Sequence, residues 1–138
     1  MHVAMRQKGQ ALIELALLAM MLVLLAAGTV AAIFAVRARS QATAAAYACA
    51  TFLSQAPDPA RAAFQAREIA RRTLEADWTA AAVDYRVQVL PEGPAGARWC
   101  RVRWTSRILF ARLLGLPGLA EGEAAAAADP ERWKARWR

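Results

Sequence analysis

The run from Leu15 to Val36 constrains this chain more than any other feature, because its 22 residues include no charged side chain. A helix of that length covers roughly 33 Å, which is enough to cross the hydrocarbon core of a bilayer. We therefore predict a transmembrane helix over residues 10–36. A secretory signal peptide fits less well, since its apolar region is shorter and lacks carboxylates. The alanine-rich sequence after Val36 leaves that alternative open.

A single carboxylate, Glu14, lies near the start of the apolar segment. A charge at the centre of a membrane helix costs about 2.5–3.5 kcal/mol on insertion scales, and less near the interface. Two explanations remain open at this point. Glu14 extends toward the headgroups, or it has a functional partner.

The sequence "RQKGQALIEL" (residues 6–15) resembles the leader and cleavage site of type IV prepilins. Its "GQALIE" is similar to TadE-like minor pilins and pseudopilins of the tight-adherence (Tad, type IVb-like) pilus system. The resemblance implies that residues 1–9 are a leader, removed after Gly9 by a prepilin peptidase. Gln10 would become the first residue, where ordinary type IV pilins have Phe. In these families the carboxylate of the fifth residue pairs with the new α-amine, so the resemblance makes Glu14 an assembly contact.

The resemblance also implies a location, which the flanking charges do not decide because basic residues lie on both sides of the span. We expect a single-pass inner (cytoplasmic) membrane protein with a cytoplasmic N-terminus and a periplasmic or extracellular domain. The implied partners are the prepilin peptidase, other pilin or pseudopilin subunits, the pilus assembly machinery and membrane lipid.

Small residues in the apolar segment predict a second packing feature. Gly28 and Ala32 are four residues apart, as are Ala27, Ala31 and Ala35. Helices approach closely along such seams, so these residues could contact other pilin stems. The high alanine content of the chain explains the pattern equally well.

After the membrane segment the helix should continue into water as a stem over residues 37–56, because no helix breaker precedes "APDPA". Asp58 is a predicted N-cap with Pro59 at the first helical position, which begins a second helix that runs to about Trp78. We expect its buried face to contain Ala63, Phe64, Ala70 and Leu74.

The next segment changes to the period of a strand. "VDYRVQVL" alternates apolar and polar residues, "PEGPAG" supplies a turn, and "ARWCRVRWTSRI" gives a second strand with Cys100, Val102 and Trp104 on one face. Residues 57–138 are thus a small α+β domain with an antiparallel sheet. Near the C-terminus "EAAAAADP" favours helix by propensity, although relatives would place a strand there. The final "ERWKARWR" is amphipathic as a strand or as a helix.

The two cysteines, Cys49 and Cys100, suggest one disulfide in an exported chain. The face assigned to Cys100 would bring it toward Cys49 on the stem. Two buried free thiols remain the alternative.

No residue pattern indicates catalysis. The only histidine, His2, lies in the segment that would be removed, and neither a metal-ligand spacing nor a phosphate-binding glycine loop occurs. We predict no enzyme activity and no cofactor.

Lys and Arg outnumber Asp and Glu by 18 to 11, and nearly all the cations are arginines. A solvated basic surface explains this most simply. The alternative function is a membrane-tethered or pilus-associated module that binds nucleic acid or another polyanion through Arg101, Arg103, Arg136 and Arg138.

Overall fold

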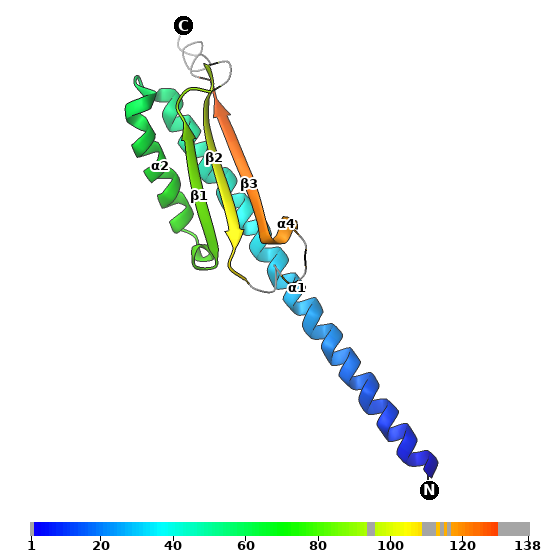
Figure 1. Ribbon diagram of the computed structural model, residues 1–138. Coiled ribbons are helices and arrows are strands. Elements are labelled where there is room, and N and C mark those ends of the chain that lie inside the picture. Colours follow the sequence, from blue (N-terminus) through cyan, green and yellow to red (C-terminus); the bar gives the residue numbers. More distant parts are fainter. Residues whose placement is uncertain (1, 94–95, 109–112, 114, 116, 130–138) are drawn as a thin grey trace.

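The computed structural model describes residues 2–93, 96–108, 113, 115 and 117–129. It has a long N-terminal helix, a second helix and a three-stranded antiparallel sheet, which confirms the predicted α+β class (Figure 1). The elements are α1 (His2–Gln55), α2 (Pro59–Glu75), the 3-10 helix η1 (Trp78–Ala81), β1 (Val83–Leu90), β2 (Arg98–Ser106), α4 (Pro117–Ala120) and β3 (Glu121–Ala128).

Helix α1 is continuous from the apolar segment into the stem and ends at Gln55, as predicted. The last turn of a helix leaves carbonyl oxygens without intrahelical donors. Here the Arg98 guanidinium, from β2, donates hydrogen bonds to the carbonyl oxygens of Leu53 and Ala56, the latter at 2.8 Å. A cation at this end also interacts favourably with the helix dipole. The tip of the stem is therefore attached to the central strand of the sheet.

One face of α1 is buried by the rest of the chain, starting at Ala31. The buried positions recur at intervals of three and four residues, which places them in one stripe along a helix. We call them the inner stripe: Ala31, Ala35, Ala38, Ala42, Ala45, Cys49 and Leu53. Because five of the seven are alanines, other elements can approach the helix backbone closely.

Helix α2 begins as predicted. The Asp58 carboxylate accepts hydrogen bonds from the backbone N–H groups of Ala60 and Arg61, at 3.1 and 3.2 Å. The helix ends at Glu75, before the expected Trp78, because the Asp77 carboxylate caps the separate helix η1.

The predicted buried face of α2 was partly wrong. The buried residues are Ala62, Ala66, Ala70 and Leu74, whereas Ala63 is half-buried and Phe64 is 79% exposed. The interval of four places the smallest side chains toward α1, so that the two helices pack closely. A phenyl ring at that contact would hold them apart.

The sheet has the order β1-β2-β3 with both pairs antiparallel. Val83 pairs with Ser106 in the first pair, and Thr105 with Glu121 in the second. The predicted inner face of β2 is confirmed, because Cys100, Val102 and Trp104 are all buried.

Strand β3 contradicts the helical propensity of its alanines. Its side chains alternate between exposed and half-buried, and Ala124, Ala126 and Ala128 pack against the buried core. Pairing with β2 and contact with α1 outweigh local propensity here. The strand expected from the relatives is thus present, while residues 131–138 lie outside the described part of the chain.

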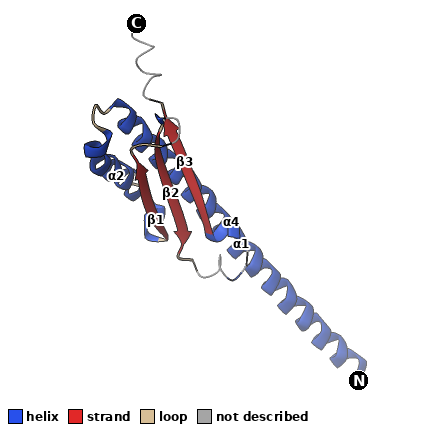
Figure 2. Cartoon of the chain, turned by 45° about the horizontal axis from the view of Figure 1, so that its top comes forward, coloured by secondary structure: helices blue, strands red, loops and turns tan. Residues whose placement is uncertain are grey.

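Both long helices lie on the same face of the sheet (Figure 2). Strands β2 and β3 pack on α1, whereas β1 packs mainly on α2. The core consequently lies between the sheet and the distal half of α1, and the first part of α1 extends away from the domain (Figure 1).

Candidate functional site

The N-terminal part of α1 carries the residues predicted for processing and assembly. The helix passes without a break through Gly9 and Gln10, and the Gln10 side-chain amide lies 3.5 Å from a carboxylate oxygen of Glu14. A spacing of four residues places both on one helix face. Position 10 and the Glu14 carboxylate are therefore neighbours, surrounded by exposed leucine and isoleucine side chains.

The first part of the apolar segment of α1, residues 10–26, has no covering from the described domain. Large side chains between Leu12 and Leu25 remain mostly exposed. The helix is long and apolar enough to cross a membrane. Contiguous exposed apolar surface of this extent is typical of a membrane anchor.

A second stripe on α1 faces away from the sheet. Its members also follow intervals of four and three, half a turn from the inner stripe, and every one is exposed. We call it the outer stripe: Thr29, Ile33, Val36, Ser40, Thr43 and Tyr47. Two shallow depressions lie along it, one around Val36 and Ile33 and the other around Thr43 and Tyr47. Sequence reasoning missed this stripe, because the spacing alone does not tell which side the domain covers.

The small-residue seam predicted for neighbouring stems needs correction. Ala31 and Ala35 belong to the inner stripe, so the chain's own domain occupies that part of the seam. Gly28 and Ala32 are half-buried. A Cβ at Gly28 would contact nothing within 4 Å.

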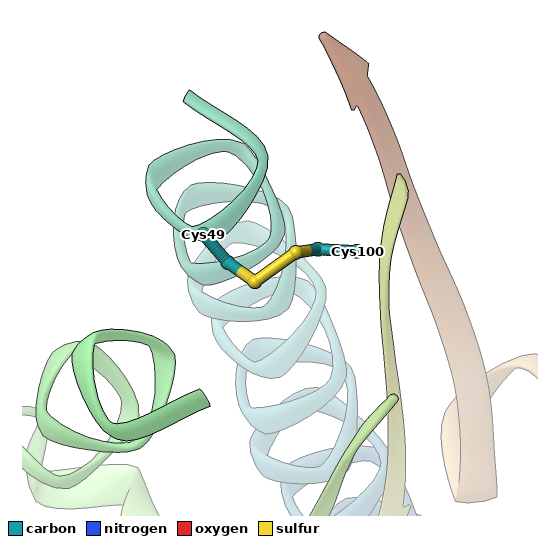
Figure 3. Close-up of a disulfide and its surroundings, with 2 residues drawn as sticks. All are labelled: Cys49 and Cys100. Atoms are coloured by element: carbon teal, nitrogen blue, oxygen red, sulfur yellow. A yellow bond between two sulfur atoms is a disulfide. The ribbon is translucent and has the colours of Figure 1, made fainter. Parts of the chain in front are cut away.

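The predicted bond between Cys49 and Cys100 is present in the structure (Figure 3). It joins the inner stripe of α1 to the central strand β2, with 6.0 Å between the Cα atoms. Both sulfurs are fully buried. A covalent link therefore crosses the core between the stem and the sheet.

The predicted polyanion contacts are only partly described. Arg101 and Arg103 lie on the open face of β2, and both form ion pairs with Glu123 of β3, at 2.9 and 2.7 Å. The hydrogen bond from Arg103 lowers the pKa of the Glu123 carboxyl. Arg136 and Arg138 lie outside the described residues. The described pair of arginines thus shares a carboxylate, which reduces the positive charge available to a polyanion.

A small polar cluster connects the stem to η1. Asp77 accepts hydrogen bonds from the Gln41 side chain, at 2.9 Å, and from the backbone N–H of Thr79, at 2.8 Å. The hydrogen bond from the Thr79 backbone is the main cause that lowers the pKa of Asp77. Next to it the ring of Trp78 packs edge-on against Phe34 of α1, with centroids 4.9 Å apart. The sequence alone did not predict this contact between Asp77 and the stem.

Among the described residues, no group of three or more His, Cys, Asp or Glu side chains could hold a metal ion.

These features define a class of protein: one apolar helix suited to membrane anchoring, continued as the stem of a disulfide-linked α+β domain. A family model described as TadE-like protein matches residues 9–51. The match begins at Gly9 and covers the apolar segment and most of the stem, so this part of the chain is similar to the TadE-like family, as the resemblance predicted. No curated protein and no solved structure matches the chain.

Proposed function

We propose that this chain is a minor pilin or pseudopilin of a Tad-type pilus, made as a precursor and cut after Gly9 by a prepilin peptidase. The observation that carries the proposal is the TadE-like match over residues 9–51, which includes both Gly9 and Glu14. The proposed role is structural and not enzymatic. The N-terminus would lie in the cytoplasm and the α+β domain outside the inner membrane.

Glu14 would set the position of the subunit among its neighbours. Cleavage creates an α-amine on Gln10 with an ordinary pKa of about 7.7–8.0, so most of it is protonated at neutral pH. In an apolar bundle, a neighbouring α-amine and the Glu14 carboxylate stabilise one axial alignment. Any other alignment would leave both charges buried without a partner.

The outer stripe supplies the surface for lateral contacts. Its intervals of three and four residues match the period at which two helices pack along a shared seam. The stripe also continues the apolar surface of the membrane segment, so a neighbouring stem could remain in contact from Thr29 to Tyr47. Other pilin subunits and the pilus assembly machinery are accordingly the proposed partners.

Processing is tested by the mass of the protein from cells with and without prepilin peptidase. We expect loss of Met1–Gly9 only when the peptidase is present, and no loss in a Gly9→Val variant. Gly28→Val is the matched control, because it places the same side chain in the same helix away from the cut. Retention of residues 1–9 in the presence of the peptidase would refute the proposal.

The role of Glu14 is tested by comparing membrane insertion with assembly. Glu14→Gln should insert as well as the wild type, since removing a charge does not hinder insertion. Its cross-linking to other pilin subunits should be largely lost. Equal cross-linking of the variant and the wild type would exclude the assembly contact.

The outer stripe is tested with two exposed aromatic residues. Tyr47→Ala removes a member of the stripe, whereas Phe64→Ala removes a side chain on α2 that lies outside it. We expect weaker co-purification with pilin subunits only for Tyr47→Ala. Identical effects of the two variants would place the lateral contact elsewhere.

Polyanion binding through Arg101, Arg103, Arg136 and Arg138 stays a prediction with less support, because Glu123 neutralises part of the described group. Such binding to nucleic acid would weaken steeply with salt and be lost when these arginines are neutralised.

A further inference from the structure

The end of the α+β domain nearest the membrane segment overlaps the apolar part of α1. Ala31 and Ala35 are 2% and 6% exposed, so protein atoms already surround one side of α1 at these positions. Both lie within the uncharged run that ends at Val36. The domain therefore begins beside the apolar segment, not above it.

The rise per residue of an α-helix gives the depth of these positions in the bilayer. A hydrocarbon core of about 30 Å takes about 20 residues of helix, which places its outer boundary near Val30 if the span begins at Ala11. The headgroup layer adds about 5–7 Å on each side, or about three to five further residues. Phe34 then lies within that layer, and a span that begins later in the chain would place Phe34 deeper still.

Aromatic and apolar side chains of the domain gather at this level. Trp78 contacts Phe34 edge-on, yet it is 60% exposed, and Ile33 and Val36 are exposed nearby on α1. The hydrogen bond from Gln41 to Asp77 holds the turn that carries Trp78 against the stem. The first cations after the apolar run, Arg37 and Arg39, are exposed one turn further along. Tryptophan beside apolar surface with arginine just beyond it is the arrangement that favours a bilayer interface.

We propose that the base of the domain, formed by Phe34 and the η1 turn with Trp78, is inserted into the headgroup layer of the membrane. The covering partner is lipid, because the surface is continuous with the membrane helix and lies at headgroup depth. This orients the domain with the α2 N-terminus away from the bilayer. The inference goes beyond the proposed pilin function and shares with it only the membrane anchoring of α1.

The test is depth-dependent quenching of tryptophan in the full chain reconstituted into phosphatidylcholine vesicles. Lipids brominated near the headgroup quench nearby tryptophans, and the signal of Trp78 is the difference between the wild type and Trp78→Phe. We expect the brominated lipid to remove most of that difference signal, while aqueous iodide removes little of it. A difference signal that iodide quenches and brominated lipid does not would overturn the proposal.

A matched control keeps the test specific to the base of the domain. Phe64→Trp, made in the Trp78→Phe background, places an exposed tryptophan near the opposite end of the domain. It should respond to iodide and not to brominated lipid, and quenching of both tryptophans by the lipid would contradict the proposed orientation. Vesicle flotation distinguishes a failure of the docking from a failure of the membrane anchoring. A protein that floats with an unquenched Trp78 refutes the docking alone. A protein that does not float refutes the anchoring on which docking and pilin function both depend.

Discussion

Removal of the Cys49–Cys100 disulfide should destabilise the α+β domain strongly. The two cysteines are 51 positions apart in the sequence. Closing a loop of that size lowers the entropy of the unfolded chain by an amount equivalent to about 4 kcal/mol at 25 °C. Domains of this size have total stabilities of about 5–15 kcal/mol, so the loss is a large fraction of the whole.

The measurement is urea unfolding in detergent micelles, followed by tryptophan fluorescence, to which the buried Trp104 contributes. Cys49→Ala combined with Cys100→Ala should lose at least the loop contribution, and the cavities left by two buried sulfurs add to it. For a urea dependence of about 1–3 kcal/mol per M, the 4 kcal/mol corresponds to a midpoint shift of about 1.3–4 M.

Reduced wild-type protein is the control, because it lacks the Cys49–Cys100 bond but keeps both sulfurs and so has no cavity. We expect its urea midpoint to lie between those of the oxidised protein and the double variant. A difference of less than about 1 kcal/mol between the free energies of unfolding of the oxidised and reduced proteins would refute the reasoning. The unfolded chain would then already hold the two cysteines close together.

Three further predictions concern α2. Ala66→Leu should destabilise the domain by about 1–3 kcal/mol by overpacking the contact with α1, whereas Phe64→Leu on the exposed face should change stability by less than about 0.5 kcal/mol in the same urea assay. Asp58→Ala should cost about 1 kcal/mol through loss of the N-cap, and unchanged stability would mean that water replaces it. The hydrogen bonds from Arg71 and Arg72 lower the pKa of Glu68 from 4.5 to about 2. The folded-state pKa of Glu68 lies below the unfolded value, so the ionised carboxylate stabilises the folded protein above pH 4.5, and this stabilisation is lost as the pH falls toward 2. Glu68→Gln should remove this part of the pH dependence of the free energy of unfolding.

Local signals in the sequence predicted the elements with strong boundaries. The end of α1, the Asp58 cap and the alternation of β1 and β2 each depend on a few adjacent residues, and the structure has all of them. The buried face of α2 was harder, because it depends on the shape of its partner. An alanine surface on α1 selects Ala62 and Ala66 for the contact and leaves the larger Phe64 in solvent.

Nonlocal pairing limited the remaining predictions. The alanines of β3 favour helix in isolation, and only hydrogen bonding to β2 makes them a strand. The same pairing brings Glu123 next to Arg101 and Arg103, so an apparently free basic face contains two ion pairs.

The proposed site has one part that is assigned from a motif and one part that depends on packing. Gly9, Gln10 and Glu14 are assigned from a short sequence with a known resemblance, and their roles in processing and assembly stay predictions. The outer stripe becomes visible only when the domain is seen to cover the opposite side of α1.

The covalent link between α1 and β2 also determines how the protein would respond to mechanical force. Tension applied between the N-terminus and the end of β3 is transmitted from Cys49 to Cys100 through the sulfurs. The intervening chain, about 50 residues with an extended length of roughly 170 Å, then bears no load. An oxidised subunit pulled from its ends would thus lengthen only outside that loop, whereas a reduced one could also extend through α2 and β1.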